Sequence, residues 1–133
     1  MGLFGGKINY SIKKKENLIV QRIKGEYTSR DLIVVNKKIL SDKEYQETHN
    51  WLVDLRYSKA LFNLDKIESI NDFFEKNISR FKGSKMAFVV ANSRQASIIT
   101  HSGKFFKERN FNLRYKLFPS ERSALEWIQA SDK

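Results

Sequence analysis

Alternating hydrophobic and polar positions predict strands at the beginning of the chain. In "KINYSIK" (residues 7–13), Ile8, Tyr10 and Ile12 share one side and the residues between them are polar. A period of two is typical of a half-buried strand. A second run, "LIVQRIKGEY" (18–27), is rich in β-branched residues and follows the short polar connection "KKEN". Two strands joined by so short a connection predict an antiparallel hairpin.

The hydrophobic pattern then changes to a helical period. Across residues 28–40 the apolar positions recur at helical spacing, and Thr28 followed by Asp31 resembles a capping box at the helix start. The same reasoning predicts further helices at residues 65–81, 92–110 and 119–130. The regular helical spacing through residue 81 makes 65–81 the clearest of these helices.

Three further apolar runs predict strands between these helices: "WLVDLR" (51–56), "KMAFVVA" (85–91) and "LRYKLF" (113–118). The predicted order is β-β-α-β-α-β-α-β-α. Strands that alternate with helices imply parallel strands joined by right-handed crossovers, and the hairpin adds an antiparallel pair on one side. The pattern therefore predicts an α/β fold with a mixed sheet, in which residues 7–130 form a single domain after a flexible lead-in at 1–6.

Composition narrows the range of functions. The chain has 133 residues, 41% of them hydrophobic, which suits one domain with one core. It has no cysteine, which excludes disulfides and thiolate metal sites and fits a cytoplasmic location. The net charge of +10 favours acidic partners, but the basic residues are spread along the chain, so we expect no specific nucleic-acid site. No apolar run approaches the roughly 20 residues of a membrane span, and nothing supports a peripheral membrane contact.

The order of elements and three motifs resemble the STAS fold, which is shared by anti-sigma-factor antagonists and the cytoplasmic domains of sulphate transporters. The resemblance is closest to the SpoIIAA-like branch. Its motifs are "WLVDLR" (51–56), "GSKMAFVVAN" (83–92) and "LFPSERSALEWI" (117–128), and together with the element order it covers most of residues 7–130. It implies a STAS-like mixed sheet with an N-terminal antiparallel hairpin.

The resemblance also bears on a phosphorylation switch. In anti-sigma-factor antagonists, the turn after the third strand carries an Asp-Ser-Ser-Gly-Leu type motif in which one serine at the helix start is phosphorylated. The equivalent stretch here, "FNLDKIE" (62–68), has Asp65 at that position and lacks the glycine. We therefore expect no phosphoserine switch. Asp65, with Glu68 three residues on, fits a helix N-cap, and a fixed charge that mimics a phosphorylated state is the alternative.

Candidate binding residues gather at the carboxyl ends of the predicted parallel strands, where α/β sheets bind ligands near the point at which the strand order reverses. The predicted interaction or switch loop comprises Asp54, Arg56, Tyr57, Ser58 and Asp65. Asp54 and Arg56 share a face of their strand, so we expect an ion pair between them. A predicted anion site combines Arg56 with the start of helix 92–110, namely Asn92, Ser93 and Arg94.

Catalytic motifs are lacking. The chain contains no Walker loop, no Gly-x-Gly-x-x-Gly and no Gly-x-Ser-x-Gly, and His49 and His101 are isolated, without metal-ligand spacing. We therefore expect a non-catalytic, regulatory binding domain with neither cofactor nor metal, whose partner is another protein. The alternative is a domain that binds a lipid or a small anionic ligand. An enzyme with a small-molecule pocket built on Asp54, Arg56 and Arg94 is a further alternative.

Overall fold

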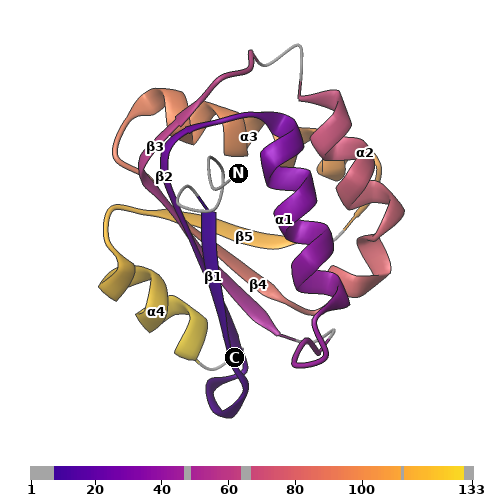
Figure 1. Ribbon diagram of the computed structural model, residues 1–133, viewed down its shortest axis with the longest axis vertical. Coiled ribbons are helices and arrows are strands. Elements are labelled where there is room, and N and C mark those ends of the chain that lie inside the picture. The colour runs from indigo at the N-terminus through magenta and orange to yellow at the C-terminus, as the bar shows by residue number, and fades with distance from the viewer. Residues whose placement is uncertain (1–7, 47–48, 64–66, 112, 131–133) are drawn as a thin grey trace, which may run out of the picture.

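In the part of the chain that the structure describes, five strands form a single mixed sheet (Figure 1). The structure is a computed structural model that describes residues 8–46, 49–63, 67–111 and 113–130. The sheet order is β1-β2-β3-β4-β5, in which β1 and β2 are antiparallel and every later neighbour is parallel. The element order and the N-terminal hairpin are those that the hydrophobic pattern predicts. The strands are β1 (Ile8–Lys13), β2 (Leu18–Tyr27), β3 (Asn50–Ala60), β4 (Lys85–Val89) and β5 (Arg114–Phe118).

The hairpin and three of the four helices begin as their sequences predict. A short 3-10 turn, η1 (Lys14–Glu16), joins β1 to β2. At the start of α1 the backbone N–H of Asp31 donates to Thr28 Oγ1, and the backbone N–H of Thr28 donates to Asp31 Oδ2. This reciprocal pair is the predicted capping box. The side chains of Asn92 and Ser120 likewise accept backbone N–H bonds at the starts of α3 and α4. The four helices are α1 (Ser29–Ser41), α2 (Glu68–Lys76), α3 (Ser93–Glu108) and α4 (Glu121–Gln129).

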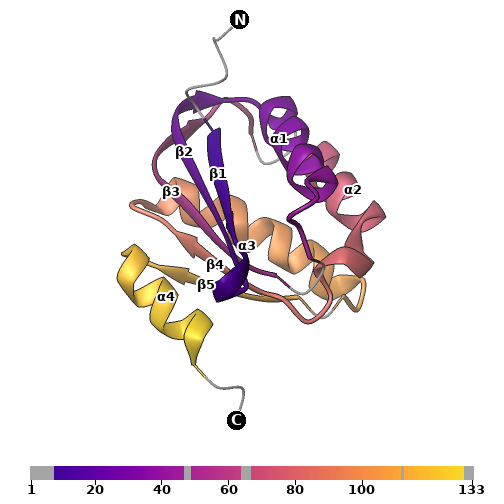
Figure 2. The ribbon, with the colours of Figure 1, turned by 60° about the horizontal axis from the view of Figure 1, so that its bottom comes forward.

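The helices cover both faces of the sheet unequally (Figure 2). Helices α1, α2 and α3 pack on one face, and α4 packs alone on the other. Because each right-handed crossover advances by one strand in the same direction, the three crossover helices share a face and the strand order contains no reversal. The expectation that the site lies where the strand order reverses is therefore wrong, although the carboxyl ends of the strands remain together at one end of the sheet.

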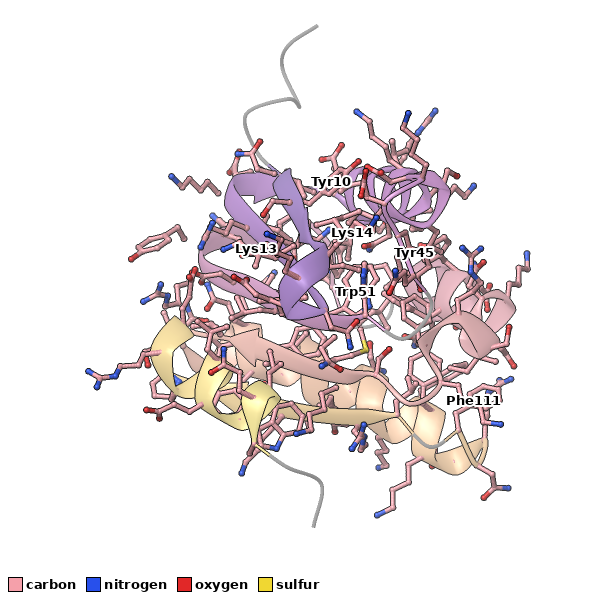
Figure 3. The ribbon with its side chains drawn as sticks, turned by 90° about the horizontal axis from the view of Figure 1, so that it is seen from below. Tyr10, Lys13, Lys14, Tyr45, Trp51 and Phe111 are labelled. Carbon is pink, nitrogen blue, oxygen red and sulfur yellow. The ribbon has the colours of Figure 1, made fainter. Side chains whose placement is uncertain are left out.

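Side-chain alternation along the inner strands supplies two apolar cores. Ile19 and Val53 face the three crossover helices, whereas Val20 and Leu52 face α4. In the larger core, the ring of Trp51 lies 5.7 Å from that of Phe81 and 6.3 Å from that of Tyr45, which comes from the loop before β3 (Figure 3). Ile8, Tyr10 and Ile12, the positions predicted from an alternating pattern, all pack in the larger core, with Ile8 buried and the other two partly buried.

Two elements, β3 and α2, differ from the prediction by more than two residues at an end. Strand β3 continues beyond Arg56 to Ala60, because β2 extends beside it as far as Tyr27 and supplies backbone partners after a register irregularity. Helix α2 begins at Glu68 and ends at Lys76, and a 3-10 turn, η3 (Ile78–Phe81), follows it. The side-chain amide of Asn77 donates to the backbone carbonyl of Phe73 at this break. Asp65, the predicted cap, lies outside the described residues.

Candidate functional site

Four charged side chains meet on the α4 side of the sheet, midway along β2 and β3 and at the start of α4. We call Arg22, Asp54, Arg56 and Glu121 the charged cluster. Asp54, only 3% exposed, accepts hydrogen bonds from Arg56 Nε at 3.1 Å and Arg56 Nη2 at 2.8 Å. Glu121 accepts two bonds of 2.9 Å from Arg22. The predicted ion pair between Asp54 and Arg56 is therefore present, and Glu121, 4.0 Å from Arg56, joins the two pairs.

The charged cluster holds Asp54 in its ionised form. Burial by itself raises the pKa of the Asp54 carboxyl, but hydrogen bonds from the side chain and the backbone N–H of Arg56, together with the positive charge of Arg56, lower that pKa below its usual value. A general acid or base works best with a pKa near the operating pH, which for a carboxyl means a raised value. The arrangement therefore favours positioning of β2, β3 and α4 over proton transfer by Asp54.

Beyond the charged cluster, side chains at the end of β3 are exposed to solvent. Tyr57, Lys59 and Leu61 occupy alternate positions, and Tyr57 and Leu61 are 64% and 50% exposed. The Arg56 guanidinium carbon lies 5.2 Å from the centroid of the Tyr57 ring, which steadies the aromatic side chain. In the sheet register Lys24 lies beside Tyr57 and Glu26 beside Lys59, and both are exposed. We call these residues the strand-end surface: Lys24, Glu26, Arg56, Tyr57, Lys59 and Leu61.

Four residues of the predicted interaction loop lie in a strand in the structure. Asp54, Arg56, Tyr57 and Ser58 all belong to strand β3, so their assignment to a loop is wrong. The backbone of β2 holds them in extended conformation through the sheet register. The Ser58 hydroxyl donates to the carbonyl oxygen of Leu55 at 2.7 Å and is therefore already engaged.

A pocket of about 350 Å³ lies at the same end of the sheet, on the face that α3 covers. We call it the α3 pocket. Its wall includes Gln95, which is buried and whose side-chain amide donates to the carbonyl oxygens of Arg56 and Ser58. The Arg94 guanidinium donates to the carbonyl oxygens of Ala60 at 3.3 Å and Phe62 at 3.4 Å. The lining residues are Tyr27, Leu55, Ser58, Lys59, Ala60, Asn92, Arg94, Gln95 and Ile98.

The structure divides the predicted anion site. Asn92 and Arg94 line the α3 pocket, and Ser93 is the exposed first residue of α3. Arg56 instead belongs to the charged cluster, because its side chain leaves β3 on the face that α4 covers. Arg56 and Arg94 therefore lie on opposite sides of β3. An anion site or catalytic pocket that needs both arginines together is contradicted by this arrangement.

The sequence prediction missed several residues of these sites, among them Glu121, Gln95 and Tyr27. Glu121 opens α4, where an acidic residue is common because it opposes the helix dipole, so nothing marked it as a partner of Arg22. Gln95 lies within a predicted helix, where its sequence position gives no sign of a binding role. Tyr27 ends a predicted strand at a position that alternation makes inward-facing, and this was the one signal available for it.

Other features add no further site. Among the described residues, no group of three or more His, Asp or Glu side chains is placed to hold a metal ion. His49 is fully buried beside Tyr45 in the loop before β3, and His101 is exposed on α3. In the part of the chain that the structure describes, every helix is too short or too polar to cross a membrane.

Comparison with known proteins identifies the fold. A scan against protein-family models and a search of curated proteins both find no match. Among solved structures, the chain resembles an uncharacterised protein of the DUF3478 family with a SpoIIAA-like fold from Shewanella loihica PV-4. The TM-score is 0.58 and the sequences are 16% identical, over 92% of this chain and 94% of that one. This likeness confirms the STAS resemblance at the level of the fold: the chain has a SpoIIAA-like fold.

Proposed function

We propose that the protein is a non-catalytic, regulatory STAS-like domain that acts by binding another protein, and that the strand-end surface is the contact. The observation that carries this proposal is the exposure of Tyr57 near the end of β3 and of Leu61 just beyond it. Tyrosine is among the residues that contribute most to protein interfaces. The backbone of Tyr57 is held in β3 and its ring lies against Arg56, so little side-chain freedom is lost on binding.

The charge of this surface specifies the partner. Lys24, Arg56 and Lys59 surround the two apolar side chains, and Glu26 is the acidic residue among them. The whole chain carries a net charge of +10. Complementary potentials raise association rates and select partners. The proposed partner is therefore a protein with an acidic surface that carries an apolar recess for Tyr57.

Two observations support binding over catalysis. The carboxylates of the charged cluster are both occupied by arginines, and the pKa of Asp54 is lowered. The stretch "FNLDKIE" lacks the serine on which a phosphorylation switch of the family type depends, so the proposed binding is not switched at that position. We include a cytoplasmic location in the proposal, which the absence of cysteine supports.

Affinity capture from native lysate tests the proposal when matched variants are compared. The variant Tyr57→Ala/Leu61→Ser removes both exposed apolar side chains. Val34→Ser is the control, because Val34 is 54% exposed but lies on α1. We expect an acidic protein to be retained by the wild type and by Val34→Ser, lost with the double variant, and released by rising salt. Retention by the double variant, or capture of anionic vesicles in place of a protein, contradicts the proposal.

A second candidate function is the binding of a lipid or a small anionic ligand. The α3 pocket supports it, because its volume of about 350 Å³ lies within the roughly 300–1,000 Å³ that ligand sites usually have. The two candidates share only Lys59 and otherwise use different residues, so each is tested with its own variants.

A further inference from the structure

The wall of the α3 pocket includes a tyrosine whose hydroxyl has no hydrogen-bond partner among the described residues. Tyr27, at the end of β2, is only 3% exposed and lines the pocket. Its ring packs edge-on against Phe62 at a centroid distance of 5.7 Å. None of the described residues forms a hydrogen bond with the Tyr27 hydroxyl. Buried phenols usually find a partner, so this group is available to a molecule in the pocket.

Positive charge lies beside this hydroxyl. Arg94 lines the same pocket and lies close enough for its charge to act on the Tyr27 phenol, opposing the burial that raises the pKa of Tyr27 to about 12. The guanidinium makes two long bonds, of 3.3 and 3.4 Å, to backbone carbonyls, which a shorter charge-assisted bond can replace. The positive end of the helix dipole of α3 meets the pocket at Asn92.

Apolar side chains form part of the remaining wall, beside Ser58 and Lys59. Leu55, Ala60 and Ile98 line the pocket, and Leu55 and Ala60 belong to the larger core. Gln95 fixes the wall, because its side-chain oxygen accepts from the N–H of Ala91 and its amide donates to the backbone of β3. A volume of about 350 Å³ is near the lower end of the roughly 300–1,000 Å³ range of ligand pockets and suits a compact molecule.

We propose that the α3 pocket binds a small organic anion, a carboxylate or phosphate carried on a compact apolar group, and that Arg94 and Tyr27 hold the anionic head. The apolar group lies against Leu55 and Ile98. This inference narrows the second candidate function and rests on it, but it does not require protein binding at the strand-end surface, with which the pocket shares Lys59.

Ligand titrations of the full-length, ¹⁵N-labelled chain, followed by NMR, test the proposal. The probes are hexanoate and hexyl phosphate, with hexanamide as a neutral match and palmitate as a long-chain comparison. We expect both short anions to shift the amide signals of Ser58, Arg94 and Gln95 at millimolar concentration, and hexanamide to have no effect there. Comparing hexanoate with hexyl phosphate identifies which anionic head the pocket prefers.

Two variants test the named contacts. Tyr27→Phe removes only the hydroxyl, and Arg94→Gln removes the charge from an exposed side chain. Each is expected to weaken hexanoate binding by about tenfold, the loss of one charge-assisted hydrogen bond. Arg122→Gln is the control, because the Arg122 side chain is 90% exposed on α4, on the other face of the sheet. Because the Tyr27 hydroxyl has no partner among the described residues, Tyr27→Phe is expected to leave the melting temperature unchanged or to raise it.

The outcomes separate this inference from the candidate function on which it rests. If hexanamide binds as tightly as the anions, or if both variants keep full affinity for hexanoate, the pocket does not recognise an anionic head group and the proposal is wrong. If palmitate binds but hexanoate and hexyl phosphate do not, the proposed ligand is not compact, and the inference is wrong although the candidate function remains. Failure of all four probes to bind overturns both.

Discussion

The side-chain ammonium of Lys85 lies 2.8 Å from the carbonyl oxygen of Ala130, so the first residue of β4 is bonded to the residue that follows α4. The same nitrogen donates to the carbonyls of Trp127 at 3.0 Å and Ile128 at 3.4 Å. The last carbonyls of a helix have no partner within it and carry its negative pole. A lysine that is only 6% exposed thus fastens the end of α4 to the sheet, while Arg22 and Glu121 fasten its beginning.

Replacing Lys85 should loosen α4. Lys85→Met keeps much of the apolar stem but removes the ammonium and leaves buried carbonyls without that donor. We expect the free energy of unfolding to fall by about 2 kcal/mol, measured by urea denaturation. Lys82→Met is the matched control, because Lys82 is exposed nearby, and it should change stability by less than about 0.5 kcal/mol. Equal effects of the two variants would show that the carbonyl contacts contribute nothing.

The charged cluster should stabilise the fold more than a surface ion pair does. Glu121→Gln removes the charge that binds Arg22 through two hydrogen bonds and lies beside Arg56. We expect a loss of about 1 kcal/mol in the free energy of unfolding, because the pair is bidentate but partly exposed. Glu126→Gln serves for comparison. It breaks the exposed pair with Arg122, at 3.9 Å, and should cost less than about 0.5 kcal/mol. The prediction fails when both variants unfold at the same urea concentration.

His49 should make stability depend on pH. Burial, followed by the charge of Lys14, lowers the pKa of the His49 ring below 6.5. Its Nδ1 accepts a hydrogen bond from the backbone N–H of Gln46, which a proton there would prevent. Between the folded-state pKa and 6.5 the unfolded chain binds more protons than the folded one. The stability contribution is therefore complete above pH 6.5 and declines as the pH falls below it.

Urea denaturation at a series of pH values measures this effect. His49→Gln should flatten the slope of unfolding free energy against pH in the window just below 6.5. An NMR titration of the His49 ring in the wild type gives its pKa directly and does not depend on whether the variant folds. A ring pKa at or above 6.5 would refute the prediction.

Replacing Gly103 in α3 by alanine should not stabilise the protein, although this substitution usually stabilises a helix. An alanine within a helix is favoured over glycine by about 1 kcal/mol. A Cβ at position 103 would collide with the hydroxyl and ring of Tyr115, which lies on β5. We expect Gly103→Ala alone to give no gain in unfolding free energy, because the Tyr115 side chain must be displaced. In the Tyr115→Ser background the same substitution should restore the gain of about 1 kcal/mol. A gain of equal size in both backgrounds would contradict the packing argument.

The sequence by itself determined the features that depend on neighbours along the chain. These are the order of strands and helices, the hairpin after Lys13, the capping box of Thr28 and Asp31, and the ion pair of Asp54 with Arg56. Each follows from side-chain period or from groups within a few residues, so local geometry is enough to predict it.

Tertiary structure decided what depends on distant segments. Strand β3 continues to Ala60 because β2 lies beside it, and Arg22 meets Glu121 although 99 positions separate them. The faces that α3 and α4 cover place Arg94 in the α3 pocket and Arg56 in the charged cluster. These outcomes depend on how the helices pack against the sheet, since the free energy of burying apolar faces selects the side of the sheet for each helix.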